Sequence, residues 1–251
     1  MTGMTTITAA YARFTSCSGC QLMLLNCEES LLAFAQQISL QAFPLVSSAM
    51  TGCDRVDLAL VEGAISKPEE VARLMELRRQ ATFLVAVGSC ALTGGVNSLV
   101  PGERAQAIRD VYGETPAELL SFTPQPVGRF VTVDFAVPGC PPERQDLLEV
   151  LASLPWGGWP GRQVMPVCME CRILENPCLL TENHLPCIGP VTQAGCRARC
   201  PSIGVPCEGC RGVVAEANFE EIYRLLLEAG LSEYDVEKHL TRFARSGPWR
   251  E

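Results

Sequence analysis

Histidine, basic charge and long apolar runs are all scarce in this sequence. The longest predominantly apolar run, residues 81–87, is far shorter than the roughly 20 residues that a membrane-spanning helix needs. Lysine and arginine total 20 against 28 acidic residues, which gives a net charge of −8. An acidic chain without a basic cluster is a poor candidate for binding nucleic acid or an anionic membrane. We therefore expect neither as a partner.

Catalytic signatures are also missing. The sequence has no Ser/His/Asp set, no phosphate-binding loop and no G-x-G-x-x-G nucleotide fingerprint. With two histidines in 251 residues, the chain is poorly equipped for proton chemistry of its own. Hydrophobic residues nevertheless make up 47% and charged residues 19%, which is ample for a packed core and excludes a disordered chain.

Cysteine is what the sequence has in abundance, with 14 residues. The N-terminal residues 1–6 carry neither the basic patch nor the apolar region of a signal peptide, and the only Arg-Arg pair lies at residues 78–79. We therefore expect a reducing, cytoplasmic location. In such a compartment clustered thiols bind metal more often than they form disulfides.

The first half of the chain alternates between strand and helix patterns. Apolar strands that are separated by helices are typical of an open parallel sheet, buried on both faces. We expect an α/β, doubly wound, flavodoxin-like domain over residues 1–155. The predicted strands are 7–14, 39–46, 56–61, 82–87 and 129–137, and the predicted helices are 22–37, 67–80, 103–112 and 141–153.

A Pro/Gly/Trp stretch at residues 154–161 indicates a linker. Eight of the 14 cysteines fall within the next irregular segment, residues 167–211, so we expect a small ferredoxin-like domain over 156–212. Helical periodicity returns afterwards, and Asn218 and Ser232 are the predicted N-caps of two helices. These helices define a C-terminal helical segment, 213–251.

Four cysteines follow strands in the first domain. The carboxyl ends of the strands of an open α/β sheet meet at one edge, so their loops should gather these thiols there. Four thiolates suit a [4Fe–4S] cluster or tetrahedral zinc, and a redox-active or buried thiol set is the alternative. The four are Cys17, Cys20, Cys90 and Cys140.

The second domain carries eight clustered cysteines, the number that two cubane clusters require. Their spacings differ from those of standard ferredoxins, so the eight can divide sequentially or in an interleaved manner. Two zinc ribbons are the alternative that the spacing leaves open. The eight are Cys168, Cys171, Cys178, Cys187, Cys196, Cys200, Cys207 and Cys210.

In combination, these motifs resemble the small, electron-transferring subunit of [NiFe] hydrogenases. The likeness is strongest to cytoplasmic multi-subunit hydrogenases of the sulfhydrogenase delta type, which are linked to NAD(P). It spans nearly the whole chain to about Gly212 and joins both groups of cysteines in the right order. The matching segments are residues 15–20, 61–64, 88–95, 138–142, 186–201 and 207–212.

The resemblance implies three [4Fe–4S] clusters: a proximal one on the first four cysteines, and a medial and a distal one on the other eight. It also implies a nickel–iron large subunit as one partner, and a flavin- and iron–sulfur-containing electron-acceptor subunit as another. An F420-linked or heterodisulfide-reductase-linked hydrogenase is the nearest alternative. A zinc-stabilised interaction module is the alternative from another class.

Several further residues compete for roles. Cys53 and Asp57 are rivals of Cys90 as ligands, but they lie at the start of a strand, whereas Cys27 is expected to be a buried thiol. We expect His184 to be an exposed loop residue. Glu62, at the end of a strand, is a candidate proton relay or a partner for a helix N-terminus.

Overall fold

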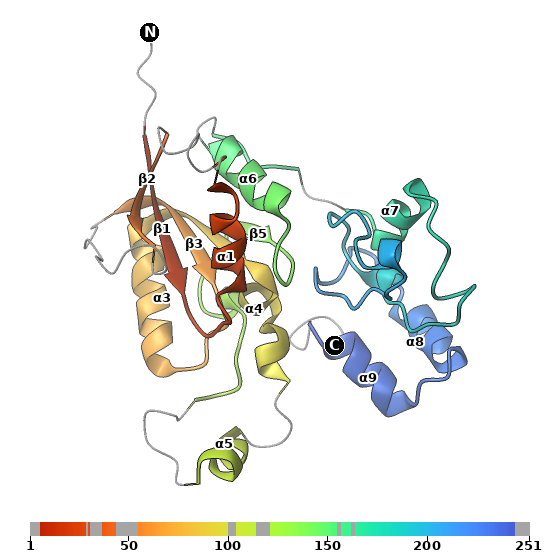
Figure 1. Cartoon of the computed structure of the whole chain (residues 1–251). Helices are drawn as coiled ribbons and strands as arrows, with labels where there is room; N and C mark the ends of the chain where they lie inside the picture. The colour runs from red at the N-terminus through yellow and green to blue at the C-terminus, as the bar shows by residue number, and fades with distance from the viewer. Residues whose placement is uncertain are drawn as a thin grey trace. The chain divides into compact units, whose positions relative to one another are not determined.

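The computed structural model describes residues 6–28, 30, 37–43, 55–99, 104–113, 121–154, 157–161 and 164–243. The chain forms two compact units, residues 1–160 and 161–251 (Figure 1). The division falls within the Pro/Gly/Trp stretch that the sequence indicated. Among the described residues, no helix has the length and apolar character needed to cross a membrane.

Unit 1 is built on a parallel sheet of five strands in the order β2-β1-β3-β4-β5. This order is that of flavodoxin-like folds, so the predicted fold class is confirmed. The central strands are apolar on both faces because helices cover both sides. The strands are β1 (Ile7–Arg13), β2 (Ile38–Ala42), β3 (Val56–Glu62), β4 (Ala81–Val87) and β5 (Phe135–Val137).

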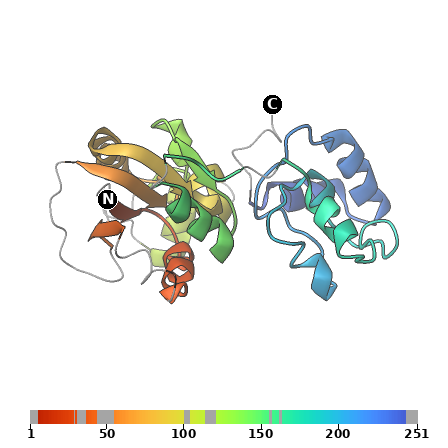
Figure 2. The ribbon, with the colours of Figure 1, turned by 90° about the horizontal axis from the view of Figure 1, so that it is seen from above.

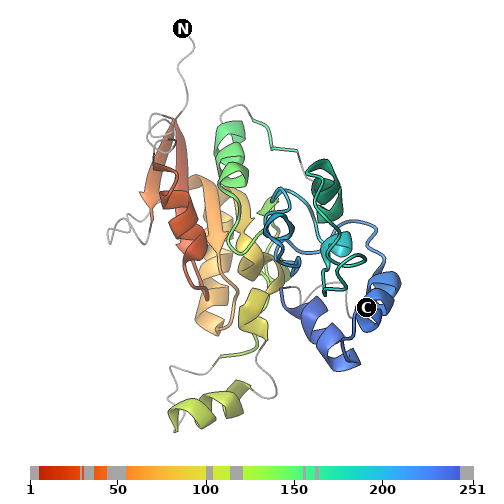
Figure 3. The same ribbon diagram turned by 45° about the vertical axis from the view of Figure 1, so that its right-hand side comes forward.

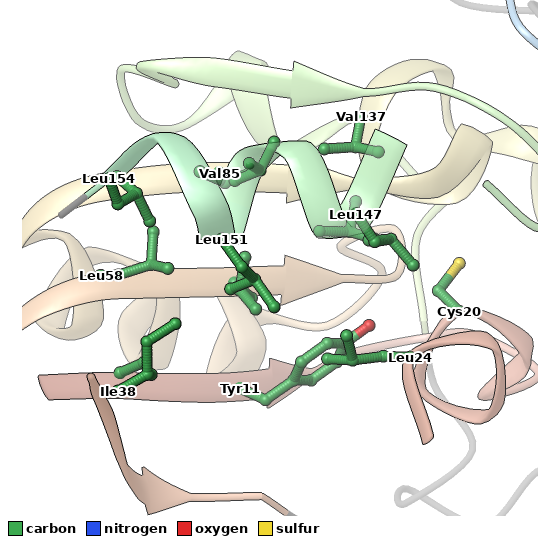
Figure 4. Close-up of a cluster of buried hydrophobic side chains, with 14 of the residues drawn as sticks. Tyr11, Cys20, Leu24, Ile38, Leu58, Val85, Val137, Leu147, Leu151 and Leu154 are labelled. Carbon is green, nitrogen blue, oxygen red and sulfur yellow. The ribbon is translucent and has the colours of Figure 1, made fainter. Parts of the chain in front are cut away.

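Helices cover both faces of this sheet (Figures 1 and 2), and an apolar core lies on each face. One core contains Leu58 and Val85 together with side chains of α1 (Gly19–Leu25) and α6 (Arg144–Ser153), and Figure 4 shows these side chains interdigitating. The other contains Ala59 and Leu84 with α3 (Pro68–Gln80) and α4 (Gly88–Thr93). Successive strand residues thus face opposite cores, as the pleat requires.

The strand predicted over residues 129–137 was largely wrong, because only Phe135–Val137 pairs with β4. A 3-10 turn occupies Val127–Arg129 instead. The Asp134 carboxylate accepts the backbone N–H of Leu84 at 2.7 Å and forms an ion pair with Arg78. The Asp134 side chain therefore occupies the N–H of Leu84 in β4, which a backbone carbonyl of a longer β5 would otherwise accept. The pairing of β4 with β5 begins only at Phe135.

The helix predicted over residues 22–37 also differs from the helix in the structure. Helix α1 starts earlier, at Gly19, and ends at Leu25, where the N–H of Cys27 turns back to the carbonyl of Leu24 at 3.0 Å. Residues 29 and 31–36 lie outside the described residues, as does Cys53. The helix predicted over 103–112 is present as α5 (Arg104–Tyr112).

Unit 2 consists of long loops and three α-helices over its described residues (Figure 3). They are α7 (Val167–Ile173), α8 (Phe219–Glu228) and α9 (Glu233–Thr241). Both predicted N-caps are confirmed: Asn218 accepts the N–H of Glu221 at 3.0 Å, and Ser232 accepts that of Asp235 at 3.2 Å.

Helices α8 and α9 share one apolar core with the cysteine-rich segment. Val167 and Leu179 of that segment lie in the same buried cluster as Ile222 and Leu226 of α8 and Val236 of α9. The division into domains at 156–212 and 213–251 stays a prediction, but the contacts show that these parts pack together.

Candidate metal centres

Four thiols meet at the carboxyl edge of the sheet in unit 1, and we call them the edge thiols: Cys17, Cys20, Cys90 and Cys140. Cys17 follows β1, and Cys20 lies in the first turn of α1. Cys90 lies in α4, directly after β4, and Cys140 follows β5. The predicted strand-end loops therefore carry these thiols to one place.

The edge thiols affect one another electrostatically. Burial raises the pKa of Cys20, and the charges of Glu62 and the other three edge thiols raise it further. Burial likewise raises the pKa of Cys90 to about 12, followed by the effects of Cys140 and Cys17. Four thiolates this close would repel one another, so a bound group with positively charged metal ions would stabilise their ionised form.

Glycines keep the space beside these sulfur atoms free. A Cβ atom on Gly88 would lie 2.5 Å from the Sγ of Cys20, and Gly88 has a left-handed φ of 82°. A Cβ atom on Gly95 would lie 3.0 Å from the Sγ of Cys90. The four-thiol donor set and this close approach of backbone to sulfur fit an iron–sulfur cluster.

The carboxylate of Glu62 lies inside the chain, with 1% of the residue exposed. It accepts the N–H groups of Cys20 at 3.4 Å and Gln21 at 3.2 Å, together with the hydroxyl of Tyr11 at 3.1 Å. Glu62 thus caps the N-terminus of α1, where Ser18 makes no side-chain cap. This is the helix-terminus alternative for Glu62, and its role as a proton relay stays a prediction.

Sequence reasoning missed Asn97, which contacts an edge thiol. Its Nδ2 donates to the Sγ of Cys90 at 3.3 Å and to the carbonyl of Thr15 at 3.1 Å. An amide donor of this kind stabilises the thiolate form and holds the Cys90 loop against the loop after β1. The residue follows Gly94-Gly95 in a 3-10 turn, and no motif marks it.

The rival ligands lie elsewhere or outside the described residues. Asp57 is at the start of β3, the opposite end from the edge thiols, and its carboxylate accepts the N–H and hydroxyl of Thr8 at 2.8 and 2.7 Å. Cys27 is fully buried and its Sγ lies 3.3 Å from the carbonyl of Met23. Cys53 lies outside the described residues, so its place stays a prediction.

A second group of four thiols lies in and after α7 in unit 2, with Cys168 and Cys171 in the helix and Cys178 and Cys187 in the loop that follows. Every pair within this group interacts electrostatically. Burial raises the pKa of Cys168 to about 12, with further contributions from the other three. A Cβ atom on Gly189 would lie 3.4 Å from the Sγ of Cys168 and 3.5 Å from that of Cys187. We call this group the α7 thiols: Cys168, Cys171, Cys178 and Cys187.

The four remaining cysteines of unit 2 are the loop thiols: Cys196, Cys200, Cys207 and Cys210. Burial raises the pKa of Cys207, the most buried of them, and its charge interacts with both Cys210 and Cys187. The N–H of Cys207 also donates to the Sγ of Cys187 at 3.2 Å, so the two groups adjoin. His184 is exposed, as expected.

No three Cys, His, Asp or Glu side chains converge closely enough to hold a single metal ion, within the part of the chain that the structure describes. The thiols instead interact as wider groups: the four edge thiols in unit 1, and the α7 thiols with neighbouring loop thiols in unit 2. A flavodoxin-like domain with thiols at the carboxyl edge of its sheet, followed by a cysteine-rich unit, is an arrangement suited to an electron-transfer subunit of an oxidoreductase.

Comparisons with known proteins identify the family. Residues 17–154 match the family of the NADH ubiquinone oxidoreductase, 20 Kd subunit, and the chain belongs to this family. It is 35% identical to the sulfhydrogenase 2 subunit delta of Pyrococcus furiosus, over 92% of this chain and 96% of that one. It is 30% identical to a subunit of the F420-non-reducing hydrogenase of Methanocaldococcus jannaschii, over 90% of this chain and 91% of that one.

A solved structure agrees with these relatives. The NAD+-reducing [NiFe]-hydrogenase in its H2-reduced state contains a chain that is 29% identical and superimposes with a TM-score of 0.57, over 62% of this chain and 94% of that one. The chain is therefore a subunit of the [NiFe]-hydrogenase type, as its resemblance to that family predicted.

The glycine at position 88 provides a test of the edge-thiol site. In Gly88→Ala the new Cβ atom would collide with the Sγ of Cys20, and the alanine backbone would have to keep the left-handed φ of the glycine. We therefore expect the loss of ~4 iron atoms per chain, the content of one cubane. Iron analysis of anaerobically purified protein measures this. The matched control is Gly128→Ala, where nothing lies within 4 Å of the new atom. Full iron retention in Gly88→Ala would contradict the site.

Proposed function

We propose that this chain is the electron-transfer subunit of a [NiFe] hydrogenase and holds three [4Fe–4S] clusters. The observation that carries the proposal is the presence of twelve thiols, four that interact at the sheet edge of unit 1 and eight within the cysteine-rich segment of unit 2. When bound, such clusters supply one-electron transfer between a nickel–iron site on the large subunit and an acceptor subunit. The reaction served is the reversible conversion of H2 into two protons and two electrons.

The contacts support a sequential division of the eight cysteines in unit 2. All six pairs among the α7 thiols interact electrostatically. Three interactions across the groups argue for an interleaved division: Cys187 with Cys207, Cys187 with Cys200, and Cys171 with Cys196. We favour the sequential one because no pair among the α7 thiols is left out.

The chain's own residues hold the thiols in place and exclude water from the buried ones. Burial removes Cys20 and Cys207 from solvent, while N–H donors face the sulfur atoms: the N–H of Thr181 donates to Cys178 at 3.5 Å, and Asn97 donates to Cys90. Donors of this kind tune the reduction potential of a bound cluster. Glu62 fixes the start of α1, and with it the position of Cys20.

The large subunit is proposed to cover the edge thiols. Cys17 and Cys140 are exposed on the chain, and the apolar side chains of Leu22 and Val96 are 52% and 43% exposed nearby in sequence. Glu62 and Gly94, by contrast, are already buried within the chain. A permanent interface here would bury more than about 2,000 Å² and would be largely apolar.

We propose a cytoplasmic complex in which the acceptor subunit carries flavin and iron–sulfur groups and reduces NAD(P). A NAD+-reducing hydrogenase is among the similar structures. The F420-non-reducing relative supports the alternative of a complex with another acceptor, such as a disulfide reductase. A zinc-stabilised interaction module remains the alternative from another class, and it predicts a colourless protein instead of a brown one.

The metal content tests the central claim. Anaerobically purified protein should contain about 12 iron and 12 acid-labile sulfide per chain, and zinc in their place would refute the proposal. Cys168→Ser with Cys187→Ser should cost ~4 iron atoms, since both belong to one cluster, whereas Cys168→Ser with Cys207→Ser should cost ~8. A loss of ~8 iron atoms from Cys168→Ser with Cys187→Ser would instead place these two cysteines in different clusters, as the interleaved division requires. Cys27→Ser is the control and should keep all its iron.

Hydrogen exchange tests the docking of the large subunit. Residues 17–25 and 90–97 should exchange more slowly in the complex than in the isolated chain, because the partner would exclude water from the edge-thiol loops. The buried strand β3 is the internal reference and should change little. Equal exchange of both segments in the two samples would mean that the large subunit docks elsewhere.

The acceptor is tested by purifying the intact complex through a tag on this chain and identifying its subunits. We expect a nickel-containing subunit, a flavin-containing subunit and H2-dependent reduction of NAD+ or NADP+. The isolated chain should take up no H2, because all its clustered thiols are assigned. A complex without flavin that reduces a disulfide would favour the alternative.

A further inference from the structure

Glu170 lies between two of the α7 thiols in sequence, in Cys168-Met169-Glu170-Cys171, yet its carboxylate contacts the loop that carries Cys196. Its Oε1 accepts the N–H of Gly195 at 2.9 Å, and its Oε2 accepts the N–H of Ala198 at 3.1 Å. The same Oε2 lies 3.9 Å from the Sγ of Cys196. The carboxylate of Glu170 thus binds the backbone both before and after Cys196, at Gly195 and Ala198.

The loop that Glu170 holds has a backbone that needs support. Gly195 has a φ of 119°, and Arg197 and Ala198 have left-handed φ values of 54° and 46°, which L side chains rarely adopt. This conformation turns the N–H groups of Gly195 and Ala198 toward a single acceptor. Without that acceptor, two backbone donors would lose their partner and the loop would relax.

Arg211 holds the same loop from another side. This residue is 5% exposed, and its Nε donates to the carbonyl of Ala194 at 2.8 Å. A Cβ atom on Gly195 would collide with its guanidinium group. The charges of Glu170 and Arg211 act on the pKa of Cys196 in opposite directions, and burial is the largest cause of its raised value. The Cys196 loop is therefore held by two charged side chains, the carboxylate of Glu170 from α7 and the guanidinium of Arg211 beside Cys210.

We propose that Glu170 is a positioning residue for Cys196, so that the C-x2-C motif of one cluster carries a side chain that serves the other. This inference rests on the proposed function. Two consequences follow for a cluster bound by the loop thiols. The carboxylate keeps Cys196 in place, and it occupies two N–H donors that could otherwise turn toward the cluster, which keeps its reduction potential low.

The test uses the intact complex and potentiometric titrations followed by electron paramagnetic resonance. Cys168→Ser and Cys207→Ser first assign the signals of the α7-thiol and loop-thiol clusters. In Glu170→Gln, which keeps the size of the side chain, we expect the potential of the loop-thiol cluster to rise and that of the α7-thiol cluster to stay. In Glu170→Ala we expect the loop-thiol signal and about a third of the iron to be lost.

Met169→Ala is the matched control, because Met169 lies in the same motif and is 42% exposed. It should leave both signals unchanged. A shift of the α7-thiol signal in Glu170→Gln, or no shift of either signal, would overturn the inference. If Glu170→Ala disturbs both clusters, the selectivity of the shift in Glu170→Gln decides. A wild-type protein without iron would instead refute the proposed function, so the two failures are distinguishable.

Discussion

The rest of this structure depends on one constraint: thiols that repel one another when ionised must be kept together. In unit 1 the parallel sheet meets this constraint, because three strand ends and one helix start deliver Cys17, Cys20, Cys90 and Cys140 to one edge. Burial and mutual repulsion raise the pKa of Cys20 and Cys90, so the arrangement is costly without a positively charged group. The scaffold must therefore be rigid where the thiols lie.

The rigidity comes from groups that are not ligands. Glu62 holds the first turn of α1 through two backbone N–H groups, and Asn97 holds Cys90 against the loop after β1. In unit 2 Glu170 likewise accepts two backbone N–H groups and holds the loop that carries Cys196. Each is a polar side chain that reaches from one element to the backbone or sulfur of another, so each fixes a distance between segments that are far apart in sequence.

Much of this could be predicted from the sequence. Buried parallel strands and helix caps have local signatures, so β1, β3, β4 and the caps at Asn218 and Ser232 were recognisable. Strand ends then predicted the grouping of the edge thiols. The short β5 was not recognisable, because it depends on the tertiary contact of Asp134 with Leu84 and Arg78.

Asn97 and Glu170 could not be predicted from the sequence for a similar reason. The contacts of Asn97 and Glu170 reach partners seven to 82 positions away, and neither residue belongs to a pattern that marks such a contact. Helix α7 was missed because its seven residues are too few to show helical periodicity. Sequence reasoning thus found the ligand candidates and overlooked the residues that orient them.

The shared core of unit 2 has a consequence for biogenesis. Ile222, Leu226 and Val236 leave the ribosome after all eight cysteines of the unit, yet they complete the core that packs against Val167 and Leu179. During translation the thiols are therefore present before their apolar support. Under the proposed function, a cluster inserted into the nascent chain would meet thiols without this core, whereas one inserted after release would meet thiols that the core already supports.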